Sequence, residues 1–111
     1  MDLQIELTEK IKQLEVSIKE LRNSGTSYAT AERDYKIKLR EECLKLRDSG
    51  MAVTLIEKVA YGIHSVAEAR FKRDVALTIY QANQEAINGI KLQLRLIEGQ
   101  INREWGANLK D

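Results

Sequence analysis

The chain has few side chains that could act as nucleophiles, general bases or metal ligands. His64 is its one histidine and Cys43 its one cysteine. His64 falls in a turn between two expected helices, where a polar residue is typical, and Cys43 falls on an apolar helical stripe, where a thiol packs more often than it reacts. The sequence has no Ser/His/Asp arrangement, no metal-ligand spacing and no glycine-rich phosphate loop. We therefore expect a non-enzyme without a metal and without a cofactor.

Three basic residues, Arg70, Lys72 and Arg73, are the best candidates for contacts with nucleic acid. They lie on early turns of a long expected helix, after a short helix and a turn, which gives the outline of a helix-turn-helix motif. Three cations neutralise few phosphates, and the net charge of +1 does not require a nucleic acid or an anionic membrane as partner. The reading in which this corner only turns the chain is therefore favoured, and DNA binding is kept as the alternative.

The composition favours long helices in a single domain, residues 1–111. There is no proline, and 43% of the residues are hydrophobic and 32% charged. A single cysteine excludes an intrachain disulfide and suits a reducing compartment. The start of the chain lacks the pattern of a signal peptide, and no apolar run approaches membrane-spanning length, so we expect an intracellular protein without a membrane partner.

The longest expected helix, residues 65–105, carries two apolar faces. Their centres lie roughly 110° apart around the helix, so two different neighbours can pack on it at once. Both follow the alternating steps of three and four residues that define a heptad seam. The first seam contains Val66, Ala69, Arg73, Ala76, Tyr80, Asn83, Ile87, Ile90, Leu94, Ile97 and Ile101, and the second seam contains Val75, Ile79, Ala82, Ala86, Gly89, Gln93 and Leu96.

The N-terminal part predicts a helical hairpin. Residues 3–22 place Leu7, Ile11, Leu14, Ile18 and Leu21 on a heptad stripe, and residues 27–48 place Ala31, Tyr35, Leu39, Cys43 and Leu46 on another. Between them, residues 23–26 read Asn-Ser-Gly-Thr, a helix stop followed by a helix start. We therefore expect two short antiparallel helices.

A short corner helix, residues 54–61, is expected to join the hairpin to the long helix. Thr54 with Glu57 and Ser65 with Glu68 both have capping-box spacing, which predicts the starts of the short and the long helix. Gly62 can end the short helix. The expected fold is thus all-α, with a hairpin and a corner helix packed on one long C-terminal helix.

The long helix would span about 58 Å and neither hairpin helix more than about 33 Å, so its C-terminal part is expected to overhang the rest. An apolar overhang predicts self-association into a coiled-coil-like homo-oligomer. Asn83 could fix the register of that contact or face water, and Trp105 could anchor the interface or cover a local core. The residues predicted to self-associate are Asn83, Ile87, Ile90, Leu94, Ile97, Ile101 and Trp105.

Two stretches, LRDSGMAVTLIEKVAYG at 46–62 and EAINGIKLQLRLIEGQINREWG at 85–106, resemble a family of small helical proteins of temperate phages and prophages of Gram-positive bacteria. The family has a proline where this chain has Ala52. The resemblance covers roughly the last two-thirds of the chain. It implies a phage setting in the host bacterial cytoplasm, commonly among early genes for DNA replication and recombination, and no catalytic residues.

The sequence therefore predicts a non-enzymatic phage accessory protein that self-associates through its long helix and acts by binding, in DNA replication or recombination. Two alternatives stay open. One is a counter-defence protein that blocks a host immune component or sequesters its ligand, and the other is a structural coiled-coil adaptor. The partner would be DNA or a host protein.

Overall fold

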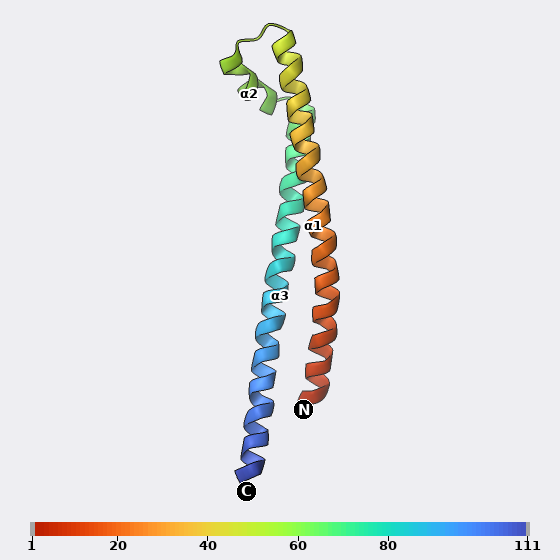
Figure 1. Ribbon diagram of the computed structural model, residues 1–111, viewed down its shortest axis with the longest axis vertical. Helices are drawn as coiled ribbons and strands as arrows, with labels where there is room; N and C mark the ends of the chain where they lie inside the picture. The colour runs from red at the N-terminus through yellow and green to blue at the C-terminus, as the bar shows by residue number, and fades with distance from the viewer. Residues whose placement is uncertain (1, 111) are drawn as a thin grey trace. The chain divides into compact units, whose positions relative to one another are not determined.

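The computed structural model describes residues 2–110, and the side chains of residues 2–107. These residues form three helices and no strand: α1 at Leu3–Asp48, α2 at Val53–Tyr61 and α3 at His64–Lys110 (Figure 1). The chain divides into two compact units. Unit 1 contains Met1–Arg22 and Gln81–Asp111, and unit 2 contains Asn23–Tyr80. The all-α class and the long C-terminal helix packed by other helices are confirmed.

Helix α1 runs through residues 23–26 without a break, so the predicted hairpin of residues 3–22 and 27–48 is wrong. Ile11, expected on the buried stripe, is 43% exposed. The other nine residues of the two predicted stripes are buried or half-buried. A row of positions with steps of four and three also continues from Leu3 through residues 23–26 to Glu42. Its buried or half-buried positions are Leu3, Leu7, Lys10, Leu14, Ser17, Leu21, Ser24, Tyr28, Ala31, Tyr35, Lys38 and Glu42.

The reason for the continuity is the packing of Tyr80 against Gly25. A Cβ atom on Gly25 would lie 3.2 Å from Cε1 of Tyr80, tighter than an ordinary contact. The same ring stacks on Tyr28, with centroids 6.1 Å apart, and Ser24 beside Gly25 is buried. A glycine inside a helix costs about 1 kcal/mol relative to alanine, and this packing offsets the cost. Residues that resemble a turn signal thus form a notch for an aromatic ring, the Gly25 notch.

The predicted overhang assumed that α3 is much longer than the helices beside it. In the structure α1 has 46 residues and α3 has 47. The expectation depended on two short N-terminal helices, neither of which exists separately. The length of α3 therefore gives no support to self-association, whereas its exposed surface can.

The corner helix α2 begins at Val53, one residue before the expected start at Thr54. Its N-cap is Ala52, and no side chain makes a capping hydrogen bond, so the predicted Thr54 capping box is wrong. Gly50, with a φ of 87°, allows the left-handed backbone that turns the chain out of α1. Gly62 is the C-cap, as predicted, and α3 begins at His64 instead of Ser65.

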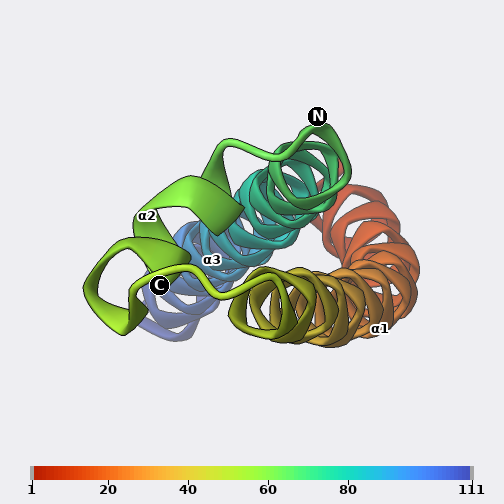
Figure 2. The same ribbon diagram turned by 90° about the horizontal axis from the view of Figure 1, so that it is seen from above.

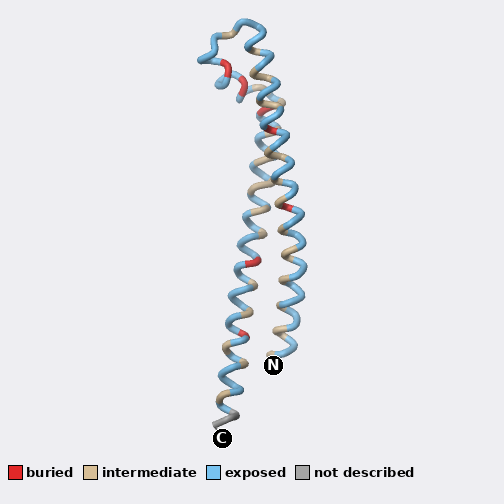
Figure 3. Tube along the Cα trace, in the orientation of Figure 1, coloured by how far each residue is buried: buried red, intermediate tan, exposed pale blue. Residues whose placement is uncertain are grey.

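Burial is concentrated in a few positions (Figure 3). In unit 2, the packed residues include Tyr35 of α1, Ile56 and Ala60 of α2, and Val66 of α3. Figure 2 shows α2 lying beside the start of α3. In unit 1 the most buried side chains are those of Ile87 and Ile97.

Candidate functional site

The first seam is covered within the chain. In unit 1, the Asn83 side-chain amide donates a hydrogen bond to the main-chain oxygen of Glu20 across the two helices, at 3.5 Å. Ile87 and Ile97 are 6% and 5% exposed. The other apolar members, Ile90, Leu94 and Ile101, are half-buried. These residues were predicted to bind a second copy. In the single chain α1 already lies over the same face, so their burial gives that prediction no support.

Trp105 differs from the rest of the predicted set, since its side chain is 65% exposed. It does not cover a local core. Of the two alternatives for Trp105, the exposed indole therefore fits an interface anchor and does not fit a cover over a local core.

The second seam is uncovered along its whole length: all seven of its positions are exposed. Five of them lie in unit 1, and the large residue Leu96 among them is 62% exposed. Leu92, on the adjoining edge of the same face, is 55% exposed. We call the unit 1 part of this surface the outer face, and it consists of Ala82, Ala86, Gly89, Leu92, Gln93 and Leu96.

Gly89 lies in the middle of the outer face, and nothing within the chain explains it. A Cβ atom built there meets no atom within 4 Å. Gly25, in contrast, is needed to admit Tyr80. Because glycine weakens a helix interior by about 1 kcal/mol relative to alanine, Gly89 costs stability without an internal compensation.

A groove of about 390 Å³ runs beside the outer face in unit 1. Glu6 and Lys10 of α1 form one wall, and Leu96, Ile97 and Arg103 of α3 are among the residues of the other. Ile97 belongs to the covered first seam and also lines this groove. The outer face is therefore continuous with the packed contact between α1 and α3.

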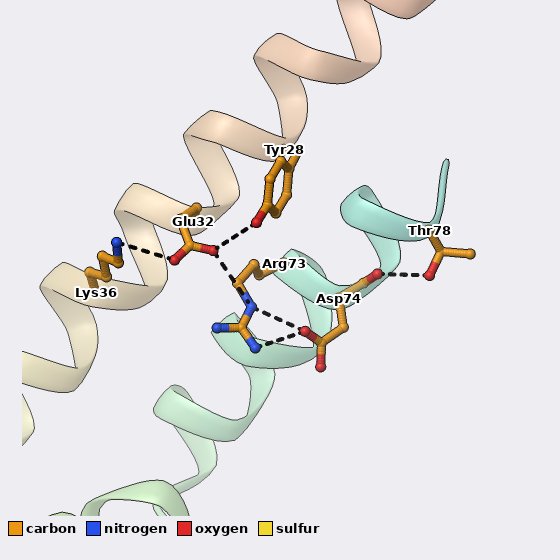
Figure 4. A network of polar contacts seen from close by, with 6 residues as sticks. All are labelled: Tyr28, Glu32, Lys36, Arg73, Asp74 and Thr78. Carbon is orange, nitrogen blue, oxygen red and sulfur yellow. Dashed lines mark hydrogen bonds and ion pairs between the residues drawn. The ribbon is translucent and has the colours of Figure 1, made fainter. Parts of the chain in front are cut away.

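Arg73, one of the three predicted DNA ligands, is engaged inside unit 2. Its guanidinium lies over the Tyr35 ring, 4.5 Å from the centroid. Its Nη2 is 2.8 Å from Oδ1 of Asp74, and its Nε is 3.8 Å from Oε2 of Glu32, which also accepts a hydrogen bond from Tyr28 (Figure 4). The hydrogen bonds to Asp74 raise the pKa of Arg73. This side chain braces α1 against α3 and is not available to a phosphate.

The other two cations point to different neighbours. Arg70 lies over the ring of Tyr61 in α2, 5.7 Å from the centroid, whereas Lys72 lines two hollows between α1 and α3. Only Gly62 and Ile63 separate α2 from α3, fewer than the three or four residues of a helix-turn-helix turn. The three basic residues therefore do not form one surface for DNA.

His64 lines the larger of those hollows, a groove of about 620 Å³ that sequence reasoning missed. Asp34, Lys38, Glu68 and Lys72 are among its other residues, so charges of both signs meet there. No sequence signal marks the groove, because its two walls come from separate segments, residues 26–38 and residues 64–72. Cys43 is half-buried. Within residues 2–107, no three His, Cys, Asp or Glu side chains are grouped closely enough to hold a metal ion.

In the part of the chain that the structure describes, no helix combines the length and the apolar character needed to cross a membrane. The fold and the outer face define an all-helical chain with an uncovered apolar surface. Comparison of the chain with protein-family models, with curated proteins and with solved structures finds no match in any of the three. The phage setting therefore stays a prediction from the resemblance.

Proposed function

We propose that the chain is a non-enzymatic binding protein that self-associates through the outer face of α3. The observation that carries this proposal is the exposure of every position of the second seam, in a helix whose first seam is buried or half-buried throughout. A heptad face of apolar and small residues is the surface by which helices recognise other helices.

The packing of unit 1 supports the proposal. Among its described residues there are only two helical segments, residues 3–22 and 81–110. Few of their side chains are buried, whereas Leu92 and Leu96 are more than half exposed. Helices obtain most of their stability from the packing of an apolar face, so a further helix on the outer face would stabilise unit 1.

The biological setting in this proposal is a temperate phage or prophage, with a role in DNA replication or recombination. It is supported by the resemblance of residues 46–62 and 85–106 to phage proteins. The occupied state of Arg73 favours a role exercised through protein contacts and not through direct contact with DNA.

The proposal is tested by the mass of the chain in solution across a range of concentrations. We expect the wild type to form an oligomer and the double substitution Leu92→Gln, Leu96→Gln to be a monomer with unchanged helical circular dichroism. Ile5→Gln with Val16→Gln is the matched control, because these two α1 residues are exposed to a similar degree, 59% and 58%. A wild type that stays monomeric at high concentration would refute self-association.

Direct DNA binding is tested separately with Arg70→Glu and Lys72→Glu, which leave Arg73 in place. Our proposal predicts no salt-dependent binding of the wild type to single- or double-stranded DNA. If the wild type binds DNA at low salt and both substitutions weaken that binding, the function would instead be DNA binding at the corner between α2 and α3.

A further inference from the structure

We infer that the partner on the outer face is a second copy of this chain, with the two α3 helices antiparallel and Gly89 at the two-fold axis. This inference rests on the proposed self-association and adds its orientation and its contact residues. A two-fold contact is isologous, so one face must be complementary to itself.

The sizes of the outer-face residues are complementary only in the antiparallel arrangement. With Gly89 opposite its own counterpart, Ala82 lies level with Leu96 of the other copy, seven residues away in each direction. Ala86 likewise lies level with the other copy's Leu92. Small residues thus face large ones along the contact, as dense packing requires. An in-register parallel pair would oppose leucine to leucine at one end and alanine to alanine at the other.

Gly89 has a packing reason in this arrangement and none in the single chain. Because a Cβ atom at Gly89 would meet open space, the position is free for the close approach of another backbone. Small residues at a helix crossing let two backbones come near each other, and Ala86 lies one turn away on the same face. The cost of a glycine in the helix interior is then offset at the interface.

The charges of this face also distinguish the two orientations. Between Ala82 and Leu96, the charged residue at the edge of the outer face is Glu85. In a parallel pair the two Glu85 carboxylates would lie side by side. In the antiparallel pair they are separated by about 12 Å along the axis, beyond the screening length at physiological salt.

The second copy would extend an interface that already exists. Ile97 is 5% exposed on the first seam and lines the groove next to Leu96. A helix placed on the outer face would therefore pack against side chains that α1 already holds in position. Since the outer face has only six residues per copy, the contact is small for a specific interface, and we expect dissociation in the micromolar range.

Disulfide trapping tests the orientation. In a Cys43→Ser background, single cysteines are introduced as Ala82→Cys, Gly89→Cys and Leu96→Cys and oxidised at concentrations where the chain is dimeric. We expect Gly89→Cys to link to itself and Ala82→Cys to link to Leu96→Cys when the two are mixed. Neither of the latter should link to itself, because residues 82 of the two copies would be about 21 Å apart and a disulfide needs Cα atoms within about 7 Å.

The outcomes separate the inference from the proposed function. Self-linkage at residues 82 and 96 in a dimeric chain would show parallel packing, which overturns the inference and leaves self-association intact. A monomer overturns both. A dimer in which none of the three positions links places the contact on another surface and also overturns both.

A second variant tests the role of Gly89 without disulfide chemistry. In Gly89→Leu the new side chain meets no atom near its Cβ within the chain, and leucine is a better helix former than glycine. The helical circular dichroism should therefore persist or rise. The bulky side chain at the two-fold axis should raise the dimer dissociation constant at least tenfold. Gly106→Leu is the matched control, since a Cβ atom there also meets nothing within 4 Å. Equal effects of the two substitutions on the dissociation constant would contradict the inference.

Discussion

Arg33 and Arg73 make the same local contact in different surroundings. In each pair the guanidinium donates two hydrogen bonds to the carboxylate of the next residue, Asp34 or Asp74. Arg33 is otherwise solvated, with 67% of its side chain exposed, whereas Arg73 is 22% exposed and lies over Tyr35. Any greater contribution of Arg73 than of Arg33 to stability therefore comes from the Tyr35 ring and from Glu32, because the contact with the neighbouring aspartate is common to both.

Substitution of both arginines by alanine measures this difference. We expect Arg73→Ala to lower the free energy of unfolding by about 1–2 kcal/mol, because it removes a partly buried cation–π contact and the packing of the side-chain stem. Arg33→Ala should change it by less than about 0.5 kcal/mol, as is usual for an exposed pair. Urea unfolding followed by circular dichroism gives both values. Equal losses would show that Tyr35 and Glu32 add nothing.

Tyr61 supplies a pH-dependent contact on the surface of α2. Its hydroxyl donates a hydrogen bond to Oε1 of Glu57 at 2.9 Å, and this bond, with the carboxylate charge, raises the pKa of Tyr61 above its ordinary value of 10.0. The contact favours the protonated phenol. Its contribution to stability is therefore fully present below pH 10.0 and is lost as the pH rises through the raised pKa.

Glu57→Ala should lower the pKa of Tyr61 toward 10.0, since it removes the acceptor and the negative charge together. The measurement is an NMR titration of the Tyr61 ring carbon that bears the hydroxyl. A Tyr61 titration that does not move would contradict this account.

At the scale of the helices, the continuity of α1 is the largest difference between the structure and the helices predicted from the sequence. Backbone amides of residues 23–26 should exchange with solvent as slowly as those one turn to either side, because they donate hydrogen bonds inside a packed helix. Amides of residues 52–54, at the start of α2 where no side chain makes a capping hydrogen bond, should exchange much faster. Hydrogen exchange followed by NMR resolves the two groups. Fast exchange at residues 23–26 would restore the hairpin.

Heptad spacing predicted the covered positions of the first seam, but it marked the second seam of α3 in the same way, and every position of that seam is exposed. Every position of the first seam, from Val66 to Ile101, is buried or half-buried, including the polar Arg73 and Asn83. The short helix near residues 54–61 was also found within one residue at its start. These features follow from local periodicity, which a single sequence carries in full.

The continuity of α1 could not be predicted in this way. Asn, Ser and Gly in succession have a low helix propensity, and the contact that outweighs it comes from Tyr80, more than fifty residues away. The same holds for Arg73, whose partners Glu32 and Tyr35 are on another helix. Local propensity indicates a break, and tertiary packing decides against it.

For the molecule as a whole, our proposal assigns different roles to the two faces of α3. The first seam is packed within the chain, and the exposed outer face would bind the partner. The single-chain fold leaves Leu92 and Leu96 exposed where a monomer would gain from polar residues. In our proposal the function of the protein therefore belongs to the assembly, and a variant that folds normally can still be inactive.

The Gly25 notch also bears on how two long helices find a single alignment. Heptad stripes repeat every seven residues, so displacing α1 by one repeat along α3 would match apolar positions almost as well. Such a displacement would bring Ile18 or Glu32 to the place of Gly25. Either side chain is much larger than a methyl group, and even a Cβ atom there would lie only 3.2 Å from Cε1 of Tyr80. The Gly25 notch thus accommodates the Tyr80 ring in one alignment of the two helices. It disfavours the shifted alignments that would otherwise compete with the native one during folding.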